Sequence, residues 1–171
     1  MTRVARLLLL VVVTASCVGC DQVTKSIARA QLAGRPTISL LGDSVRLLYA
    51  ENPGGFMSLG ADLPEPVRSL VFGPVVAATL TLLVWIALRN RALGPVQVAA
   101  VALVIAGGAG NLIDRALFGT VRDFMNLGIG TLRTGIFNVA DFAVLAGVSV
   151  MLVTSHREEL QRPGRDDGPG E

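Results

Sequence analysis

The sequence has little charge for its length. Charged residues make up 16% of its 171 residues, whereas a water-soluble domain usually carries about a quarter. Hydrophobic residues make up 51%, so the shortage of charge indicates that lipid is the solvent for much of the chain. The formal net charge of +2 is small and does not indicate a nucleic-acid-binding protein.

Histidine and cysteine are also scarce. His156 is the only histidine, and it follows the last apolar run, which excludes Ser-His-Asp and Cys-His catalysis. Most zinc sites need a cluster of His or Cys, so no metal site and no cofactor are expected. Cys17 and Cys20 are too few for a disulfide framework. A Cys-x-x-Cys redox motif belongs near a βαβ pattern, which is absent here.

Long apolar segments dominate what remains. A helix that crosses the bilayer core needs about 20 mostly apolar residues, and four segments meet this requirement: 7–30, 69–88, 93–113 and 137–155. The sequence therefore predicts an all-α membrane protein with four transmembrane helices, in which residues 1–156 form one domain. Residues 157–171 are polar and rich in Gly and Pro, which predicts a disordered cytoplasmic tail.

Basic residues flank these segments mainly on one side. They precede the first segment, fill the turn between the second and third, and follow the fourth: Arg3, Arg6, Arg89, Arg91, His156, Arg157, Arg162 and Arg165. The positive-inside rule then places both termini in the cytoplasm and the loops 33–68 and 114–136 outside. Within the first outer loop, 37–41 and 44–49 read as two short strands around the turn signal Gly42-Asp43, which predicts a small extracytoplasmic β element.

The first twenty residues allow a second interpretation. A basic start, an apolar core and then Cys17 or Cys20 resemble a lipoprotein signal peptide with its lipidated cysteine. Neither cysteine has Leu three positions before it, and three further apolar spans follow. The sequence therefore favours retention of this segment as the first transmembrane helix, although a non-enzymatic lipoprotein or assembly factor remains an alternative.

Two carboxylates stand at the outer edge of the third and fourth segments. The third segment leaves the membrane outward and the fourth re-enters there, so Asp123 and Asp141 are expected at similar depth. Two nearby carboxylates share a proton, and such a pair can perform acid–base hydrolysis. Alternatively, Asp141 pairs with Arg115 or Arg122 while Asp123 faces water, or the acids serve a proton-coupled small transporter.

Two further ionisable side chains end the first segment. Asp21 and Lys25 are four residues apart and so share one helix face. They either form an ion pair that supports the helix end or contact a substrate directly.

Five ordered blocks resemble lipoprotein signal peptidase, also called signal peptidase II. These blocks are Asp21-Gln22-Val23-Thr24-Lys25, Glu51-Asn52-Pro53-Gly54-Gly55-Phe56, Gly107-Gly108-Ala109-Gly110-Asn111-Leu112-Ile113-Asp114-Arg115, Val121-Arg122-Asp123-Phe124 and Phe137-Asn138-Val139-Ala140-Asp141. The resemblance implies an aspartyl endopeptidase of the bacterial inner membrane, active near its outer face. Its substrates would be prolipoproteins whose cysteine carries diacylglycerol, cut just before that cysteine.

The resemblance also implies roles for particular residues. Asp123 and Asp141 would be the catalytic pair, with no metal or cofactor. Supporting or substrate-binding positions would be Asp21, Lys25, Asn52, Gly107, Asn111, Arg115 and Asn138. We place Asn52 in a Gly-rich outer loop that could cover the site, and Gly107 where a helix or a substrate backbone approaches closely. The expected partners are lipid-modified prolipoproteins and membrane lipids, with a monomeric enzyme.

Overall fold

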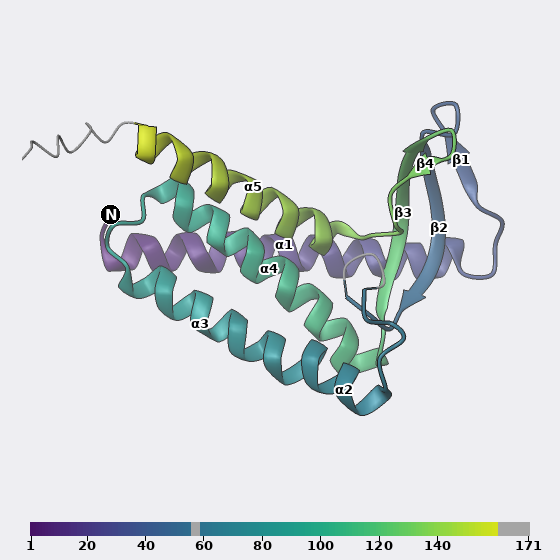
Figure 1. Ribbon diagram of the computed structural model, residues 1–171, viewed down its shortest axis with the longest axis horizontal. Coiled ribbons are helices and arrows are strands. Elements are labelled where there is room, and N and C mark those ends of the chain that lie inside the picture. Colours follow the sequence, from purple (N-terminus) through teal and green to yellow (C-terminus); the bar gives the residue numbers. More distant parts are fainter. Residues whose placement is uncertain (56–58, 161–171) are drawn as a thin grey trace, which may run out of the picture.

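Four long helices and a small sheet build the protein (Figure 1). The computed structural model describes residues 1–55 and 59–160. The helical elements are α1 (Arg3–Leu32), α2 (Glu65–Leu70), a π-helical turn (Val71–Val75), α3 (Val76–Arg89), α4 (Pro95–Phe118) and α5 (Val139–Leu160). Elements 65–89 form one continuous helix, so four helices are long and apolar enough to cross a membrane. The predicted fold class is confirmed.

The helices extend further than the apolar runs that predicted them. At 1.5 Å per residue, the 30 residues of α1 span about 45 Å, whereas the hydrocarbon core is about 30 Å thick. One polar end of α1 therefore lies beyond the core. Helix α4 continues past residue 113 to Phe118, and α5 continues to Leu160. Residues 157–160 are thus helical, contrary to the predicted tail, and 161–171 lie outside the described residues.

Helix α4 is the centre of the bundle because it contacts α1, α3 and α5. Two of its glycines permit the approaches of α5 and α1. A Cβ atom on Gly107 would lie 2.2 Å from the carbonyl oxygen of Ala140 in α5, and one on Gly110 would lie 2.6 Å from Asp21 Oδ2 in α1. Gly107 therefore lets a neighbouring helix, rather than a substrate backbone, approach α4.

This packing predicts different costs for two adjacent substitutions. Gly107→Ala should destabilise the protein by about 1–3 kcal/mol because its Cβ meets backbone that can move only if α4 and α5 separate. Gly108→Ala is the matched control, since its Cβ meets the flexible end of the Leu80 side chain. Thermal unfolding in detergent should show a clearly lower midpoint for Gly107→Ala; equal midpoints would contradict the close crossing.

The sheet has four strands in the order β1-β2-β3-β4, all antiparallel. The strands are β1 (Ile38–Leu40), β2 (Val45–Asn52), β3 (Val121–Ile129) and β4 (Leu132–Arg133). The first two match the predicted strands closely. The last two were not predicted, and they bring the segment between α4 and α5 into the sheet. Residue 123 thus lies on a strand instead of in a loop.

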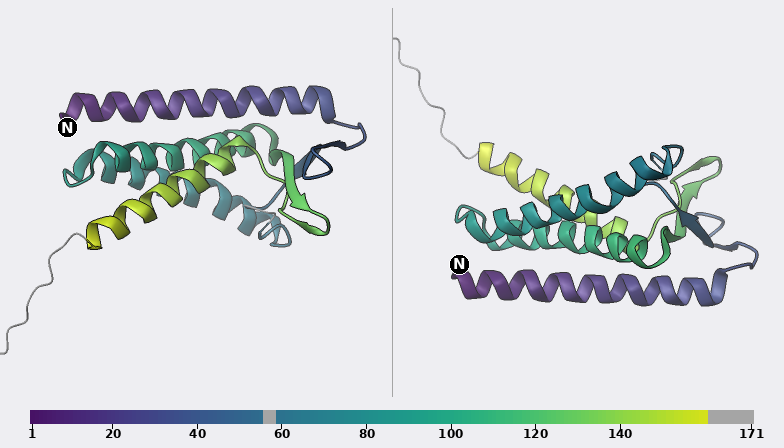
Figure 2. Two further views of the ribbon diagram at one scale, coloured as in Figure 1. Left: turned by 90° about the horizontal axis from the view of Figure 1, so that it is seen from above. Right: turned by 90° about the horizontal axis from the view of Figure 1, so that it is seen from below.

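The sheet packs against the C-terminal end of α1. Ala28 and Leu32 of α1 form a buried cluster with Phe124 of β3. Figure 1 shows the first residue and the last turn of α5 at one end of the bundle and the sheet at the other. Figure 2 shows the same separation from two further directions. The sheet and everything it carries are therefore remote from the chain's N-terminus.

Candidate active site

Asp123 is held between two asparagine side chains. It lies on β3 with only 2% of its surface exposed. Asn52 Nδ2 donates to its Oδ2 at 2.9 Å, and Asn138 Nδ2 donates to its Oδ1 at 2.6 Å. Asn52 is the last residue of β2, paired with Val121, so it belongs to a strand and not to a loop. The residues 56–58 of the expected covering loop lie outside the described part of the chain.

Asp141 occupies the first turn of α5. Its Oδ2 accepts a hydrogen bond from the backbone N–H of Asn138 at 3.2 Å, while Asn138 Oδ1 accepts from the backbone N–H of Asp141 at 2.9 Å. This reciprocal pattern is that of a helix capping box. Asn111 Nδ2 donates to Asp141 Oδ1 at 2.8 Å. The start of α5 and the C-terminal half of α4 therefore fix this carboxylate together.

Asn138 joins the two carboxylates. Its side-chain amide donates to Asp123 and its backbone N–H donates to Asp141. The carboxylates of β3 and α5 are therefore both hydrogen-bonded to this one residue. Burial, together with the nearby charge of Asp141, raises the pKa of Asp123 to about 6, although the hydrogen bonds from Asn52 and Asn138 favour its ionised form. The alternative of a water-facing Asp123 does not hold.

Asp21 and Lys25 form a fully buried ion pair with an Nζ–Oδ2 distance of 2.8 Å. Lys25 Nζ also donates to Asn111 Oδ1 at 2.8 Å and lies 3.4 Å from Asp114. Asp21 Oδ1 accepts from the backbone N–H of Ala140 at 2.9 Å. This pair links α1 to α4 and α5 behind the two acids, so the structure favours support of the helices over direct contact with a substrate.

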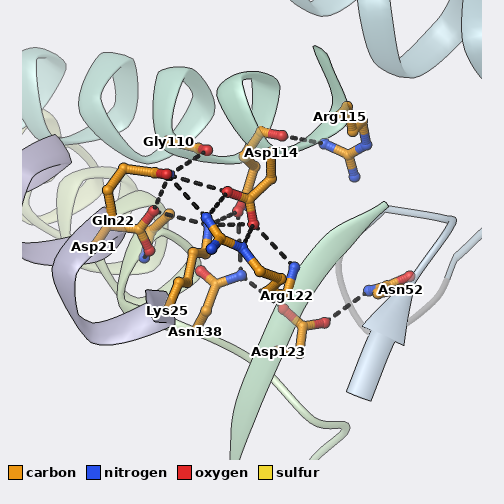
Figure 3. Close-up of polar contacts among 12 residues, drawn as sticks. Asp21, Gln22, Lys25, Asn52, Gly110, Asp114, Arg115, Arg122, Asp123 and Asn138 are labelled. Atoms are coloured by element: carbon orange, nitrogen blue, oxygen red, sulfur yellow. Dashed lines mark hydrogen bonds and ion pairs between the residues drawn. The ribbon is translucent and has the colours of Figure 1, made fainter. Parts of the chain in front are cut away.

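Three residues of this network were not among the predicted site residues: Gln22, Asp114 and Arg122 (Figure 3). Asp114 accepts from the backbone N–H of Arg122 at 3.0 Å and from its guanidinium at 2.7 and 3.2 Å. Arg122 therefore pairs with Asp114 and not with Asp141. Gln22 Nε2 donates to both Asp21 and Asp114 at 3.1 Å. Since Arg122 precedes Asp123, these contacts fix the start of β3.

The sequence held a signal for this network. Asp114 is the first charged residue after the apolar run 93–113, and a charge that the helix buries needs a partner. The partner, Arg122, lies eight residues further along the chain, beyond the end of α4. Only the position of β3 reveals that they meet.

Arg115 extends away from this network toward the loop that follows β2. One guanidinium nitrogen donates to the carbonyl oxygen of Gly54 at 2.5 Å, and the guanidinium carbon lies 5.0 Å from the centre of the Phe72 ring. The charge of Arg115 also interacts with both Asp123 and Asp141. It therefore connects the C-terminal end of α4 with the loop that follows β2, beside the acids.

Comparisons with known proteins agree with this arrangement. A family model described as signal peptidase (SPase) II matches residues 13–157. The lipoprotein signal peptidase of Syntrophus aciditrophicus is 31% identical over 83% of this chain and 88% of its own length. That of Treponema pallidum is 34% identical over 82% of this chain and 79% of its own. That of Chlorobaculum parvum is 38% identical over 67% of this chain and 73% of its own.

Solved structures share the fold. A bacterial membrane enzyme solved by the in meso method at 2.3 Å resolution superposes with a TM-score of 0.78 at 24% identity, covering 92% of this chain and 93% of that one. Nothing in these comparisons supports a transporter. Its family places this multi-pass membrane protein among the peptidases, and the chain belongs to the signal peptidase II family.

Proposed function

We propose that the chain is an aspartyl endopeptidase that removes signal peptides from diacylglyceryl-modified prolipoproteins. The observation that carries this proposal is the contact of Asp123 and Asp141 with a single residue, Asn138, at the sheet end of the bundle. The proposed cut lies just before the lipidated cysteine. The names of the relatives support the lipoprotein substrate.

The two acids would hydrolyse the peptide bond as a pair that shares one proton. The ionised carboxylate takes a proton from a water molecule, whose oxygen attacks the scissile carbonyl carbon. The protonated carboxyl polarises the carbonyl oxygen, and a proton then passes to the leaving amine as the bond breaks. Such a pair titrates as a unit, so either Asp123 or Asp141 can begin as the base.

The surrounding amides would hold both carboxylates in position for this reaction. Asn52 and Asn138 donate to Asp123, and Asn111 donates to Asp141. Each amide donor favours the ionised form of the acid it contacts, which keeps one member of the pair available as base. Among these residues, Asn111 also accepts from Lys25, so the buried ion pair sets the orientation of its amide.

Location and orientation follow from the same proposal. The basic residues at the N-terminus, between α3 and α4 and after α5 would face the cytoplasm of a bacterial inner membrane. The acids would then lie near the outer face. Diacyl chains of the substrate could remain in the bilayer while the peptide reaches the pair. We propose a monomeric enzyme, in which residues of the same chain hold both acids.

Cleavage of a defined peptide tests the proposal. Purified protein in lipid vesicles should cut a diacylglyceryl-modified prolipoprotein peptide before its cysteine and should leave the unmodified peptide intact. No group of three His, Cys, Asp or Glu side chains in residues 1–55 and 59–157 is placed to hold a metal, so a chelator should not change the rate. Equal cutting of both peptides, or loss of cutting with the chelator, would contradict it.

The proton shared by the acids predicts a pH dependence. The raised pKa of Asp123 means that the proton is retained to higher pH than on an ordinary carboxyl and is lost as pH rises through about 6. We therefore expect kcat/KM to fall above that pH, because kcat/KM reports the ionisations of the free enzyme.

Asn52→Ala should shift the fall in kcat/KM to higher pH by roughly one pH unit, because a hydrogen bond that favours the ionised form of Asp123 is removed. Asn126→Ala is the matched control: Asn126 is a buried asparagine on β3 that donates to the carbonyl oxygen of Thr134 and not to either acid. If Asn52→Ala leaves the pH of this fall in kcat/KM unchanged, or shifts it to lower pH, the assignment of the titration to Asp123 is contradicted.

A further inference from the structure

The three most exposed large hydrophobic side chains among the described residues lie in two turns of the sheet. Leu41, between β1 and β2, is 80% exposed, and Ile129 and Leu132, on either side of the turn between β3 and β4, are 83% and 82% exposed. A single exposed leucine is common on a protein surface. A group of three at one edge is a feature that indicates a partner.

The two turns, residues 41–44 and 129–132, form one edge and are called the paired turns below. The backbone N–H of Gly128 donates to the carbonyl oxygen of Ser44 at 2.9 Å. Arg133 donates to the carbonyl oxygen of Asp43 at 2.8 Å, and its guanidinium lies 3.4 Å from the Asp43 carboxylate. These contacts join the two turns that carry the three apolar side chains.

The backbone of the first turn is held in an unfavourable conformation. Leu41 has φ of +52° and Asp43 has φ of +70°, a region that bulky L residues rarely adopt. Strain of this kind, where it persists, often accompanies a functional constraint. Here it holds an aliphatic side chain outward at the end of the turn, where no residue of the protein covers it among those described.

The position of the paired turns indicates what covers them. In Figure 1 the strands run across the end of the bundle, and the turns project beyond its side past α5. Along the direction of the helices they lie level with the last turns of α1, which extend past the hydrocarbon core by length. A projection beside the bundle at this level lies over lipid and not over protein.

We propose that the paired turns insert Leu41, Ile129 and Leu132 into the phospholipid leaflet that surrounds the sheet end of the bundle. Each of these side chains favours an apolar phase over water by roughly 10-fold or more. Arg46 and Arg133 lie directly behind them on β2 and β4. Their guanidinium groups share the single carboxylate of Asp43, which leaves a net positive charge that suits lipid phosphates.

An inserted edge would fix the depth of the sheet. Strand β2, which begins after the first turn, carries Asn52, and strand β3, which ends at the second turn, carries Asp123. The paired turns would therefore act as a second attachment to the bilayer, in addition to the four helices, for the part of the protein that holds these two side chains.

Fluorescence of a single tryptophan tests the insertion without reference to peptidase activity. Trp85→Phe removes the native tryptophan, and Leu41→Trp, Ile129→Trp or Leu132→Trp then supplies one reporter in the full chain. The matched control is Thr37→Trp, because Thr37 is exposed and precedes β1 at its opposite end. Each variant is reconstituted in phosphatidylcholine vesicles with or without bromine on the upper part of the acyl chains.

In these vesicles the three turn reporters should emit at shorter wavelength than the Thr37→Trp reporter. Brominated lipid should quench them, and acrylamide in the water should quench them less than it quenches the control. Quenching by acrylamide alone, as for a reporter in water, would overturn the proposal. A turn reporter that is shielded from both quenchers would also overturn it, since a protein surface and not lipid would then cover the turns.

Discussion

Replacing either Asp123 or Asp141 by asparagine is expected to abolish cleavage while the protein still inserts and folds. Asparagine preserves shape and size but can neither deprotonate water nor donate an acidic proton. General acid–base groups contribute about 10²–10⁴-fold in rate. Because the two acids act as one unit, the double variant should be little slower than either single variant.

The measurement is single-turnover cleavage of the diacylglyceryl-modified peptide in vesicles, alongside thermal unfolding. Asp62→Asn is a matched control, since Asp62 is an exposed carboxylate in the loop between β2 and α2, and it should retain the full rate. Near-normal cleavage by Asp123→Asn or Asp141→Asn would contradict the assignment of these two acids as the catalytic pair. An unfolding midpoint well below that of the unchanged protein would instead assign the acid a structural role.

Composition and the length of the apolar runs sufficed to predict four helices, because a membrane-spanning helix needs a long apolar run and such a run is visible in the sequence. About 20 apolar residues per span are needed, and polar residues on either side do not interrupt such a run. The helix ends were less predictable. Asp114 and Arg115 lie within α4 because Gly119, at φ of +76°, ends this helix with a left-handed cap, whereas the apolar run stops at Ile113.

The strand that carries Asp123 could not be predicted in the same way. The residues Val121-Arg122-Asp123-Phe124-Met125 do not alternate between apolar and polar, so the two-residue period of a half-buried strand is missing. Most of this strand is buried on both faces, which removes the need for alternation. Its pairing with β2 joins segments far apart in the chain, and such pairing depends on tertiary structure.

Pairing of the site residues was predictable only in part. The spacing of Asn138 and Asp141 put both on one helix face, and the structure shows them in a reciprocal capping arrangement. The four-residue spacing of Asp21 and Lys25 likewise predicted their ion pair. Partners across elements, such as Asn52 with Asp123, follow from the register of β2 and β3, which local spacing does not contain.

The ion pair inside the bundle should be far more important for stability than the one on the sheet. Lys25→Met removes the cation that Asp21 contacts at 2.8 Å, with both side chains fully buried. Breaking a buried pair by removing one partner leaves an uncompensated charge and costs about 3–5 kcal/mol. The double variant Lys25→Met with Asp21→Asn should recover part of that loss, because the stranded charge is then removed as well.

The exposed pair of Arg46 and Asp43 supplies the comparison. Its side chains are 38% and 42% exposed, and water already solvates both charges, so Arg46→Met should change the unfolding free energy far less than Lys25→Met does. Unfolding free energies of the three variants in one detergent give the answer. If Lys25→Met costs no more than Arg46→Met, then Gln22, Arg122 and the N–H of Ala140 neutralise the buried acids without the lysine. The linkage of α1 to α4 and α5 would in that case rest on neutral hydrogen bonds and the Asp114–Arg122 pair.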